Sequence, residues 1–150
     1  MAQGDFIVFD TAILNLLNDW DDSNTFYYGL VTSSAPTPTR NTVAPHWNGS
    51  GTTNFYTYQV SIGGTSYTGP KTLGSFTFTE SSNIFTLDFA DPPTISQDAS
   101  GFTDARWAIL FNNTDASKRC LAALDLGGPI SIQAGTFDFD FHANGLIQIN

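Results

Sequence analysis

The residues best spaced for catalysis in this chain are two aspartates, Asp138 and Asp140, in the segment Phe137-Asp138-Phe139-Asp140-Phe141. Glycoside hydrolysis needs two carboxyl groups that flank a cleft and differ in their surroundings. Side chains at positions i and i+2 of a strand share one face and therefore one environment. We interpret this pair as the solvated side of a strand, with the three phenylalanines on its buried side.

The two histidines, His46 and His142, are the other candidates for acid–base or nucleophilic chemistry. His142 lies in a turn-forming sequence with Asn144 and Gly145, which indicates a role in turn geometry. His46 has no second His or Cys at metal-ligand spacing. The chain also lacks a Gly-x-Ser-x-Gly motif, a P-loop and a Gly-rich dinucleotide fingerprint. We therefore predict no catalytic residue, no cofactor-binding residue and no metal ligand.

Two further features bear on metal and thiol chemistry. The acidic segment Asp19–Asn24 has clustered oxygens, as a Ca²⁺ site requires, but its spacing differs from that of the calcium-binding loop, which alternates ligands around a glycine and ends in Glu. We interpret it as a solvated helix end and turn. Cys120 is the one cysteine, which excludes an intrachain disulfide and a zinc site of several thiolates. We expect it to pack as a small strand residue.

Length and charge restrict the class of protein. The 150 residues predict one domain, 1–150. The formal net charge of −9 argues against binding to nucleic acid and to anionic membrane surfaces. No run of about 18 apolar residues occurs, and Met1–Asp5 lacks the features of a signal peptide, so we expect synthesis in a cytoplasm. Only 13% of residues are charged, and a surface of hydroxyls and amides loses little hydration energy when a partner covers it.

A short helix is predicted over Thr11–Asp19, with Asp10 as its N-cap. Apolar residues recur here at helical spacing and form one stripe: Phe9, Ile13, Leu16, Leu17 and Trp20. A helix of this length is not stable alone in water, so we expect it to pack on a sheet.

The rest of the chain contains short segments rich in aromatic and β-branched residues, most of which alternate apolar and polar positions. We expect strands at Thr25–Thr32, Thr53–Ile62, Thr72–Thr79, Ile84–Phe89, Arg106–Phe111, Arg119–Leu126, Thr136–Phe141 and Leu146–Ile149. Turn signals separate them at Gly63-Gly64, Glu80–Asn83, Gly127-Gly128-Pro129 and His142–Gly145. About eight strands predict a mainly β fold: an antiparallel two-sheet β-sandwich or jelly-roll-like barrel with one short N-terminal helix.

The segment Ser33–Gly51 differs from its surroundings, because prolines interrupt it and Ser, Thr, Asn and Gly dominate it. It cannot be a central strand, and a structureless stretch of this length is often functional. It is either a mobile surface loop or an arm laid on a neighbouring molecule, and Trp47 is either an interface anchor or a core residue. We take the termini and five residues of this segment as candidate partner contacts: Pro36, Pro38, Pro45, His46 and Trp47.

Four blocks of sequence carry a family resemblance: Gly64–Leu73, Ala105–Phe111, Leu124–Gly128 and Phe137–Ile149. In order and spacing they resemble four patterns of a group of small tailed-bacteriophage virion structural proteins. Those patterns are a Gly-Thr-x-Tyr-Thr-x-Gly-x-x-Leu turn, an Ala-Arg-Tyr-Ala-Val-x-Tyr strand, an Asp-Phe-Gly turn, and a closing hairpin of alternating aromatics followed by Ala-x-Gly-Ile/Leu. Pro70 stands where the first pattern has a second glycine.

The resemblance implies a non-enzymatic virion protein, with capsid decoration (cement) on the outer face of the head as the leading role. The implied partners are the phage major capsid protein and further copies of the chain in a dimer or trimer, and the implied location is the capsid surface. Two other functions stay open. One is a tail tube, adaptor or fibre-associated protein. The other is a carbohydrate-binding β-sandwich module with Trp47, Tyr56, Tyr58 and Tyr67 as a stacking platform.

Overall fold

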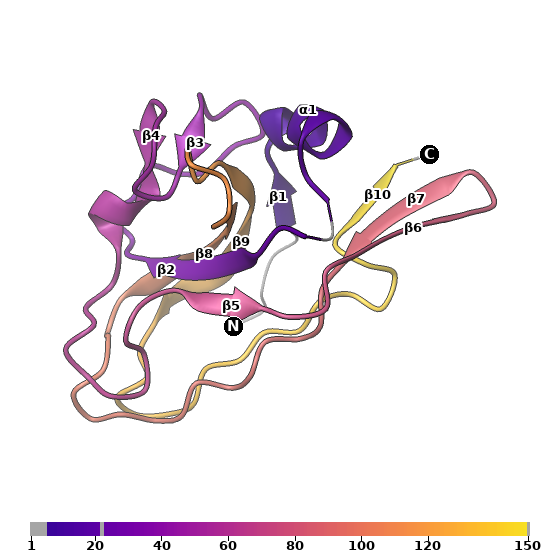
Figure 1. Cartoon of the computed structure of the whole chain (residues 1–150). Helices are drawn as coiled ribbons and strands as arrows, with labels where there is room; N and C mark the ends of the chain where they lie inside the picture. The colour runs from indigo at the N-terminus through magenta and orange to yellow at the C-terminus, as the bar shows by residue number, and fades with distance from the viewer. Residues whose placement is uncertain (1–5, 22, 150) are drawn as a thin grey trace.

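The computed structural model describes residues 6–21 and 23–149 (Figure 1). The fold is mainly β, with antiparallel sheets and one short α-helix, as the sequence predicts. Within the described residues the strands are β1 Phe6–Val8, β2 Phe26–Val31, β3 Pro45–His46, β4 Thr53–Asn54, β5 Lys71–Leu73, β6 Thr77–Ser81, β7 Ile84–Asp88, β8 Ala105–Asn112, β9 Cys120–Ile130 and β10 Ile147–Ile149. The helices are α1 Asp10–Asn18 and the 3₁₀-helix η1 Phe55–Tyr58. None of the described helices is long and apolar enough to cross a membrane.

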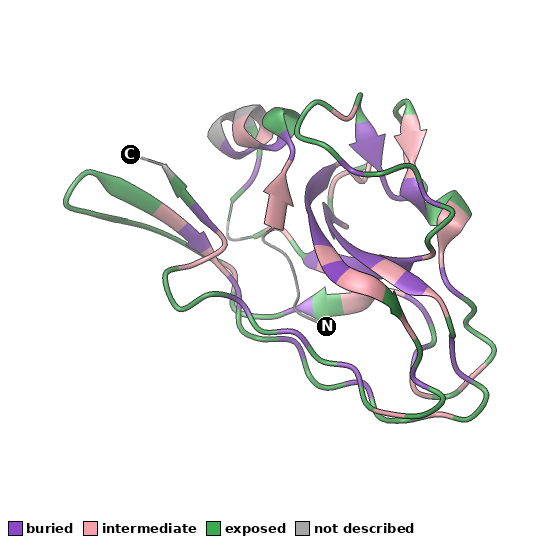
Figure 2. Cartoon of the chain, turned by 180° about the vertical axis from the view of Figure 1, so that it is seen from behind, coloured by how far each residue is buried: buried purple, intermediate pink, exposed green. Residues whose placement is uncertain are grey.

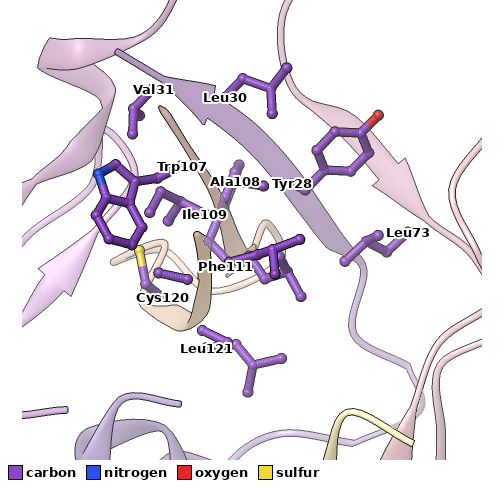
Figure 3. Packing of buried hydrophobic residues seen from close by; sticks show 14 of the residues in the cluster. Tyr28, Leu30, Val31, Leu73, Trp107, Ala108, Ile109, Phe111, Cys120 and Leu121 are labelled. Carbon is purple, nitrogen blue, oxygen red and sulfur yellow. The ribbon is translucent and has the colours of Figure 1, made fainter. Parts of the chain in front are cut away.

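The central layer is a five-stranded antiparallel sheet with the order β1-β9-β8-β2-β5. Nearly every residue of β8 and of the first half of β9 is buried, since other segments cover both faces of the sheet. Figure 3 shows the side chains of β2, β8 and β9 packed together in this core. A three-stranded antiparallel sheet, β10-β7-β6, extends away from the body of the molecule, and β3 and β4 form a short parallel pair (Figure 1).

One face of the central sheet is covered by three extended segments, residues 59–70, 89–104 and 131–146, instead of by a regular second sheet. Residues 59–70 adjoin residues 89–104, since Thr65 N and Ser66 N donate to Asp98 Oδ2. Residues 89–104 and 131–146 run beside one another in both views (Figures 1 and 2). Backbone hydrogen bonds join them at a few points: Ile95 N donates to Phe137 O at 2.7 Å, and Asp98 N donates to Ile132 O at 2.9 Å. The result is a sandwich-like arrangement whose second layer is mostly irregular.

The predicted strand Thr136–Phe141 has the expected facing, with its three phenylalanines buried and its two aspartates exposed. Among the described residues, however, it forms one isolated bridge, between Phe137 and Ile95, and no ladder. The closing strand β10 pairs with β7, so the predicted closing hairpin is wrong. Ring packing holds the segment instead, with Phe139 edge-on to Tyr28 at 5.1 Å between centroids. Burial of aromatic surface is not directional. It therefore determines that the phenylalanine side chains point into the core, but it does not determine which strand the segment pairs with.

The segment Thr53–Ile62, predicted as one strand, turns into η1 after β4. Asn54 caps this helix, because its side-chain oxygen accepts a hydrogen bond from Tyr56 N at 3.1 Å. Phe55 is thereby buried against Phe9, with ring centroids 6.1 Å apart. Asn side chains that bond the nearby backbone compete with strand pairing, and here that local interaction overrides the alternation of residue types.

Three further departures from the predicted elements occur at glycines. Strand β9 continues through Gly127 and Gly128, at φ 80° and 147°, where the sequence predicts a break. The pair Gly63-Gly64 does not form a hairpin turn; instead, the backbone of Gly64 passes so close to Asp98 that a Cβ there would lie 2.4 Å from the carboxylate Oδ2. The predicted strand Thr72–Thr79 divides near Gly74 into β5 and β6, which belong to different sheets.

Helix α1 confirms the predicted helix to within one residue at each end. Asp10 is not its cap, because Phe9 occupies the N-cap position and no side chain caps the helix. The Asp10 carboxylate instead accepts a hydrogen bond from Arg40 Nη2 at 2.9 Å. Of the apolar stripe, Phe9, Leu16 and Trp20 are buried, while the side chain of Leu17 lies outside the described part. The predicted strands at β2, β7 and β8 and in the first half of β9 are confirmed.

Candidate functional site

The catalytic candidates of the sequence do not come together in the fold. Asp138 and Asp140 are exposed on an extended segment. His142 is exposed in a turn, where its Nδ1 accepts a hydrogen bond from Asn144 N at 3.1 Å. His46 is buried in β3, its Nδ1 accepts from Gly49 N at 3.0 Å, and desolvation lowers the pKa of its imidazole. Each histidine thus fastens its own turn.

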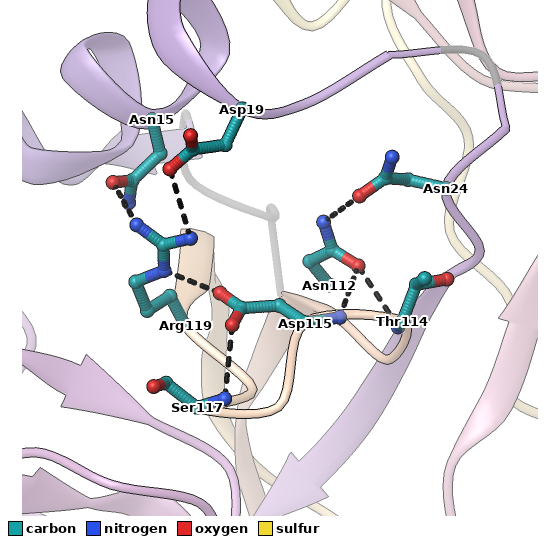
Figure 4. A network of polar contacts seen from close by, with 8 residues as sticks. All are labelled: Asn15, Asp19, Asn24, Asn112, Thr114, Asp115, Ser117 and Arg119. Carbon is teal, nitrogen blue, oxygen red and sulfur yellow. Dashed lines mark hydrogen bonds and ion pairs between the residues drawn. The ribbon is translucent and has the colours of Figure 1, made fainter.

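The acidic segment after α1 is a turn, as predicted. The Asp21 carboxylate accepts hydrogen bonds from the Ser23 and Asn24 side chains and from Ser23 N, and these bonds lower the pKa of Asp21. Asp22 lies outside the described residues. Asp19 binds Arg119 Nη2 at 3.3 Å, within a network that ties α1 to the loop before β9 (Figure 4). In the described part of the chain, no group of three or more His, Cys, Asp or Glu side chains is placed to hold a metal ion.

The arm Ser33–Gly51 is folded back onto its own chain, which corrects the predicted set of partner contacts. Four of the five residues in that set are buried, and only Pro36 is exposed. The buried four are Pro38, Pro45, His46 and Trp47. Trp47 N donates to Lys118 O at 2.9 Å, and its indole ring stacks on Phe111 with centroids 5.1 Å apart. The Trp47 ring is thus buried in the chain's own core and needs no partner molecule to cover it. The four buried side chains offer no accessible surface for contact with a partner.

The predicted carbohydrate platform is not assembled. Trp47 is buried against Phe111, and Tyr67 is buried edge-on against Phe102 with its hydroxyl accepting a hydrogen bond from Leu30 N at 2.9 Å. Of the four rings proposed, only Tyr56 is exposed, at 43%. A stacking platform needs several ring faces open to solvent in a row, and these four rings do not provide one.

A surface cavity of about 400 Å³ lies beside β5. Hydroxyl-bearing residues form most of its lining, and Lys71 is its one charged group. The Lys71 Nζ lies 5.9 Å from the centre of the Tyr67 ring, an arrangement that stabilises the cation. The lining contains no carboxylate or histidine that could act as an acid or base, so the cavity does not supply a catalytic set.

The most distinctive exposed feature is the hairpin formed by β6 and β7. Its turn residues Ser82 and Asn83 both have left-handed backbone, at φ 54° and 64°, the conformation of a two-residue type I′ turn. The Glu80 carboxylate accepts a hydrogen bond from Asn83 N at 2.8 Å and so fastens the turn. The hairpin therefore has a defined shape although it projects from the body, and Figure 2 shows its outer part exposed.

One face of this hairpin carries a stacked pair of exposed aromatic rings. Phe78 and Phe85 lie diagonally across the two strands, with ring centroids 6.0 Å apart and an interplanar angle of 24°. They remain 44% and 43% exposed. Leu87, on the same face nearer the body, is buried. The apolar face of the three-stranded sheet thus begins in the core and continues into solvent.

A hollow of about 490 Å³ adjoins this face, between α1 and β6. Its apolar lining comes from Leu16, Trp20, Phe76 and Phe78. Phe76 itself packs on Phe26, with ring centroids 4.9 Å apart, so the floor of the hollow is part of the core. We call Phe78, Phe85 and the neighbouring Ile84, which is 37% exposed, the aromatic hairpin. Its open faces and the adjoining hollow together form an exposed apolar surface.

Comparisons of the chain with protein-family models, with curated proteins and with solved structures found no match.

Sequence reasoning missed the aromatic hairpin as a site although it predicted the strands. The alternation in Ile84–Phe89 indicates that Phe85, Leu87 and Phe89 share one face, and Leu87 and Phe89 are indeed buried. Alternation reports the facing of side chains and not how far the covering layer extends. Charge gives no signal either, since β6 contains Glu80 and β7 contains Asp88.

Proposed function

We propose that this chain is a non-enzymatic structural protein of a phage virion that decorates the outer face of the capsid, with the aromatic hairpin as a contact. The observation that carries the proposal is the exposed Phe78–Phe85 stack on a projecting sheet. Apolar surface that continues from the core into solvent marks an interaction surface in a soluble protein. The kind of partner follows from the resemblance of the turn and strand blocks to tailed-phage virion proteins.

The charge of the chain supports an outer rather than an inner position on the head. A net charge of −9 is repelled by packaged DNA, whose phosphates require a basic surface. The three residues of the aromatic hairpin are uncharged, so their coverage by the major capsid protein costs little desolvation, whereas Glu80, which is opposite Phe85 in the ladder, requires a polar or cationic group on the partner. Covering the exposed part of each ring contributes on the order of 1 kcal/mol. A protein that binds the assembled shell and not its free subunits stabilises the shell by mass action.

Immunogold labelling of purified phage particles with antibodies against the chain tests the location. We expect label on the head. Label confined to the tail would support the tail alternative and contradict decoration, and particles without label would contradict both.

Rebinding of the purified protein to heads depleted of it tests the contact surface. Replacing both Phe78 and Phe85 by serine is expected to weaken binding at least about tenfold, because buried aromatics dominate protein interfaces. Ile62→Ser is the matched control, since Ile62 is 49% exposed and lies outside the hairpin. Equal binding by the double variant and the wild type would remove the hairpin from the proposal. Point changes are preferable to deletion of the arm, which would take Trp47 out of the core.

A further inference from the structure

Among residues 6–21 and 23–149, strand β6 is an open edge of the three-stranded sheet, because the order β10-β7-β6 leaves one of its sides without a neighbour. All five of its residues, Thr77–Ser81, are exposed. Its pairing with β7 is continuous, without a register shift. Soluble proteins usually protect such an edge with charged side chains, prolines, bulges or a very short strand; β6 has no lysine, proline or bulge, and Glu80 is its one charge. The edge is therefore available for a further strand.

The backbone groups that face this open edge can be identified from the neighbouring strand. The Leu87 carbonyl accepts a hydrogen bond from Leu146 N at 2.8 Å, so the polar groups of Leu87 point toward β10. Phe78 is opposite Leu87 in the ladder, and its N–H and C=O consequently point away from β7. Because the pattern alternates along a strand, Glu80 also presents its N–H and C=O to the open edge, whereas Thr79 bonds to β7.

We propose that two copies of the chain pair through this edge, with β6 antiparallel to β6 of the second copy and a two-fold axis at Thr79. In this register Phe78 of each copy is opposite Glu80 of the other. The N–H of each then donates to the carbonyl of the other, so every outward backbone group named above gains a partner. A second copy suits the edge because residues 78 and 80 are equally spaced about Thr79, which makes the edge complementary to itself.

The pairing has a consequence for the aromatic hairpin. A two-fold axis perpendicular to the sheet keeps the same face of both copies on the same side, so the Phe78–Phe85 stacks of the two copies lie on one face of a joined sheet. The two Glu80 carboxylates lie near the axis and repel each other. The net charge of −9 on each copy also opposes association, and salt screens this repulsion. The inference is independent of the proposed function, since it requires no capsid.

Sedimentation equilibrium of the purified full chain over a range of concentrations tests the pairing. We expect a monomer–dimer equilibrium that shifts toward dimer as salt is added. Glu80→Gln keeps the N–H and removes the charge, and it is expected to tighten the dimer. Glu80→Pro removes the same charge and also the outward N–H, without loss of a bond to β7, and it is expected to weaken the dimer at least about tenfold. A chain that stays monomeric, or a dimer that Glu80→Pro leaves unchanged, would overturn the proposal.

Cross-linking provides a second test that does not depend on how well Glu80→Pro folds. With the axis at Thr79, Thr79→Cys places two thiols opposite each other, in a pair without backbone hydrogen bonds where the Cα atoms are about 4.5 Å apart, close enough for a disulfide. Thr77→Cys is the matched control, because in this register Thr77 is opposite Ser81 and far from its own counterpart. Cys120 is buried and does not compete. We expect an interchain disulfide with Thr79→Cys and none with Thr77→Cys, and equal cross-linking of both would overturn the register.

Discussion

The indole ring of Trp47 lies parallel to the ring of Phe111, with an interplanar angle of 2° and centroids 5.1 Å apart. This stack closes the face of the central sheet opposite the three extended segments. It also explains why the Pro-rich arm is part of the fold. The arm carries Trp47 over β2, where Gly29 leaves room for the ring, and Trp47 N anchors it to Lys118 O at 2.9 Å.

Trp47→Ala is expected to destabilise the chain by about 3–5 kcal/mol, since it leaves a cavity over Phe111 and Gly29. Chemical denaturation followed by fluorescence measures the change. Val43→Ala, in the same arm but 64% exposed, is the control and should change the free energy of unfolding by less than about 0.5 kcal/mol. Similar small effects of both variants would mean that the arm does not pack as described.

Gly29→Ala is expected to cost at least about 2 kcal/mol, because the new Cβ overpacks the site. An ideal Cβ at Gly29 would lie 2.2 Å from Trp47 Cη2, so the ring must shift. In the Trp47→Ala background this clash is absent, and the cost of Gly29→Ala should largely disappear. A double-mutant cycle with denaturation free energies measures this coupling. Additive effects of the two changes would contradict direct contact between Trp47 and position 29.

Asp98 is expected to make stability depend on acid pH. Backbone N–H groups of Ser66, Ser100 and Thr65 bind its carboxylate and lower its pKa from 3.8 to about 2. A depressed pKa means that the stabilisation is complete above the ordinary value and is lost as pH falls through about 2. Thermal unfolding at pH values from 7 to 2 should give a higher melting temperature for the wild type than for Asp98→Asn at neutral pH. The difference between the two melting temperatures should shrink in acid. A difference in melting temperature that stays constant with pH would contradict the proposal that the Asp98 carboxylate holds residues 59–70 against residues 89–104.

Arg119→Met is expected to destabilise the chain by about 1–3 kcal/mol and to loosen the end of α1. The guanidinium binds Asn15 Oδ1 at 2.5 Å, Asp19 Oδ2 at 3.3 Å and the Asp115 carboxylate, so it joins the helix to the β8–β9 loop (Figure 4). Hydrogen exchange of the α1 amides checks the local effect. Arg119→Lys keeps the charge but cannot reach all three acceptors, and it should give an intermediate result. Unchanged exchange in Arg119→Met would show that the network does not hold the helix.

Much of the fold was predictable because it follows from local periodicity. The helical spacing of Phe9, Leu16 and Trp20 identified α1, and the aromatic and β-branched segments identified β2 and β7. The facing of Phe137, Phe139 and Phe141 was also correct, because alternation alone decides which side chains share a face. The lone Cys120 was correctly expected to be a buried strand residue, and burial raises the pKa of its thiol well above the ordinary value.

Other features were decided only by the tertiary structure. Trp47 looks the same in sequence whether it anchors a partner or closes the core, and only the space above Gly29 and Phe111 distinguishes the two. Phe85 and Phe89 have the same alternation, yet Phe89 is buried and Phe85 is 43% exposed, since the covering layer ends between them. The sequence by itself thus determined the residue faces and the β class. The extent of each covering layer, and with it the candidate contact surface, depends on contacts between residues distant in the chain, which local periodicity does not encode.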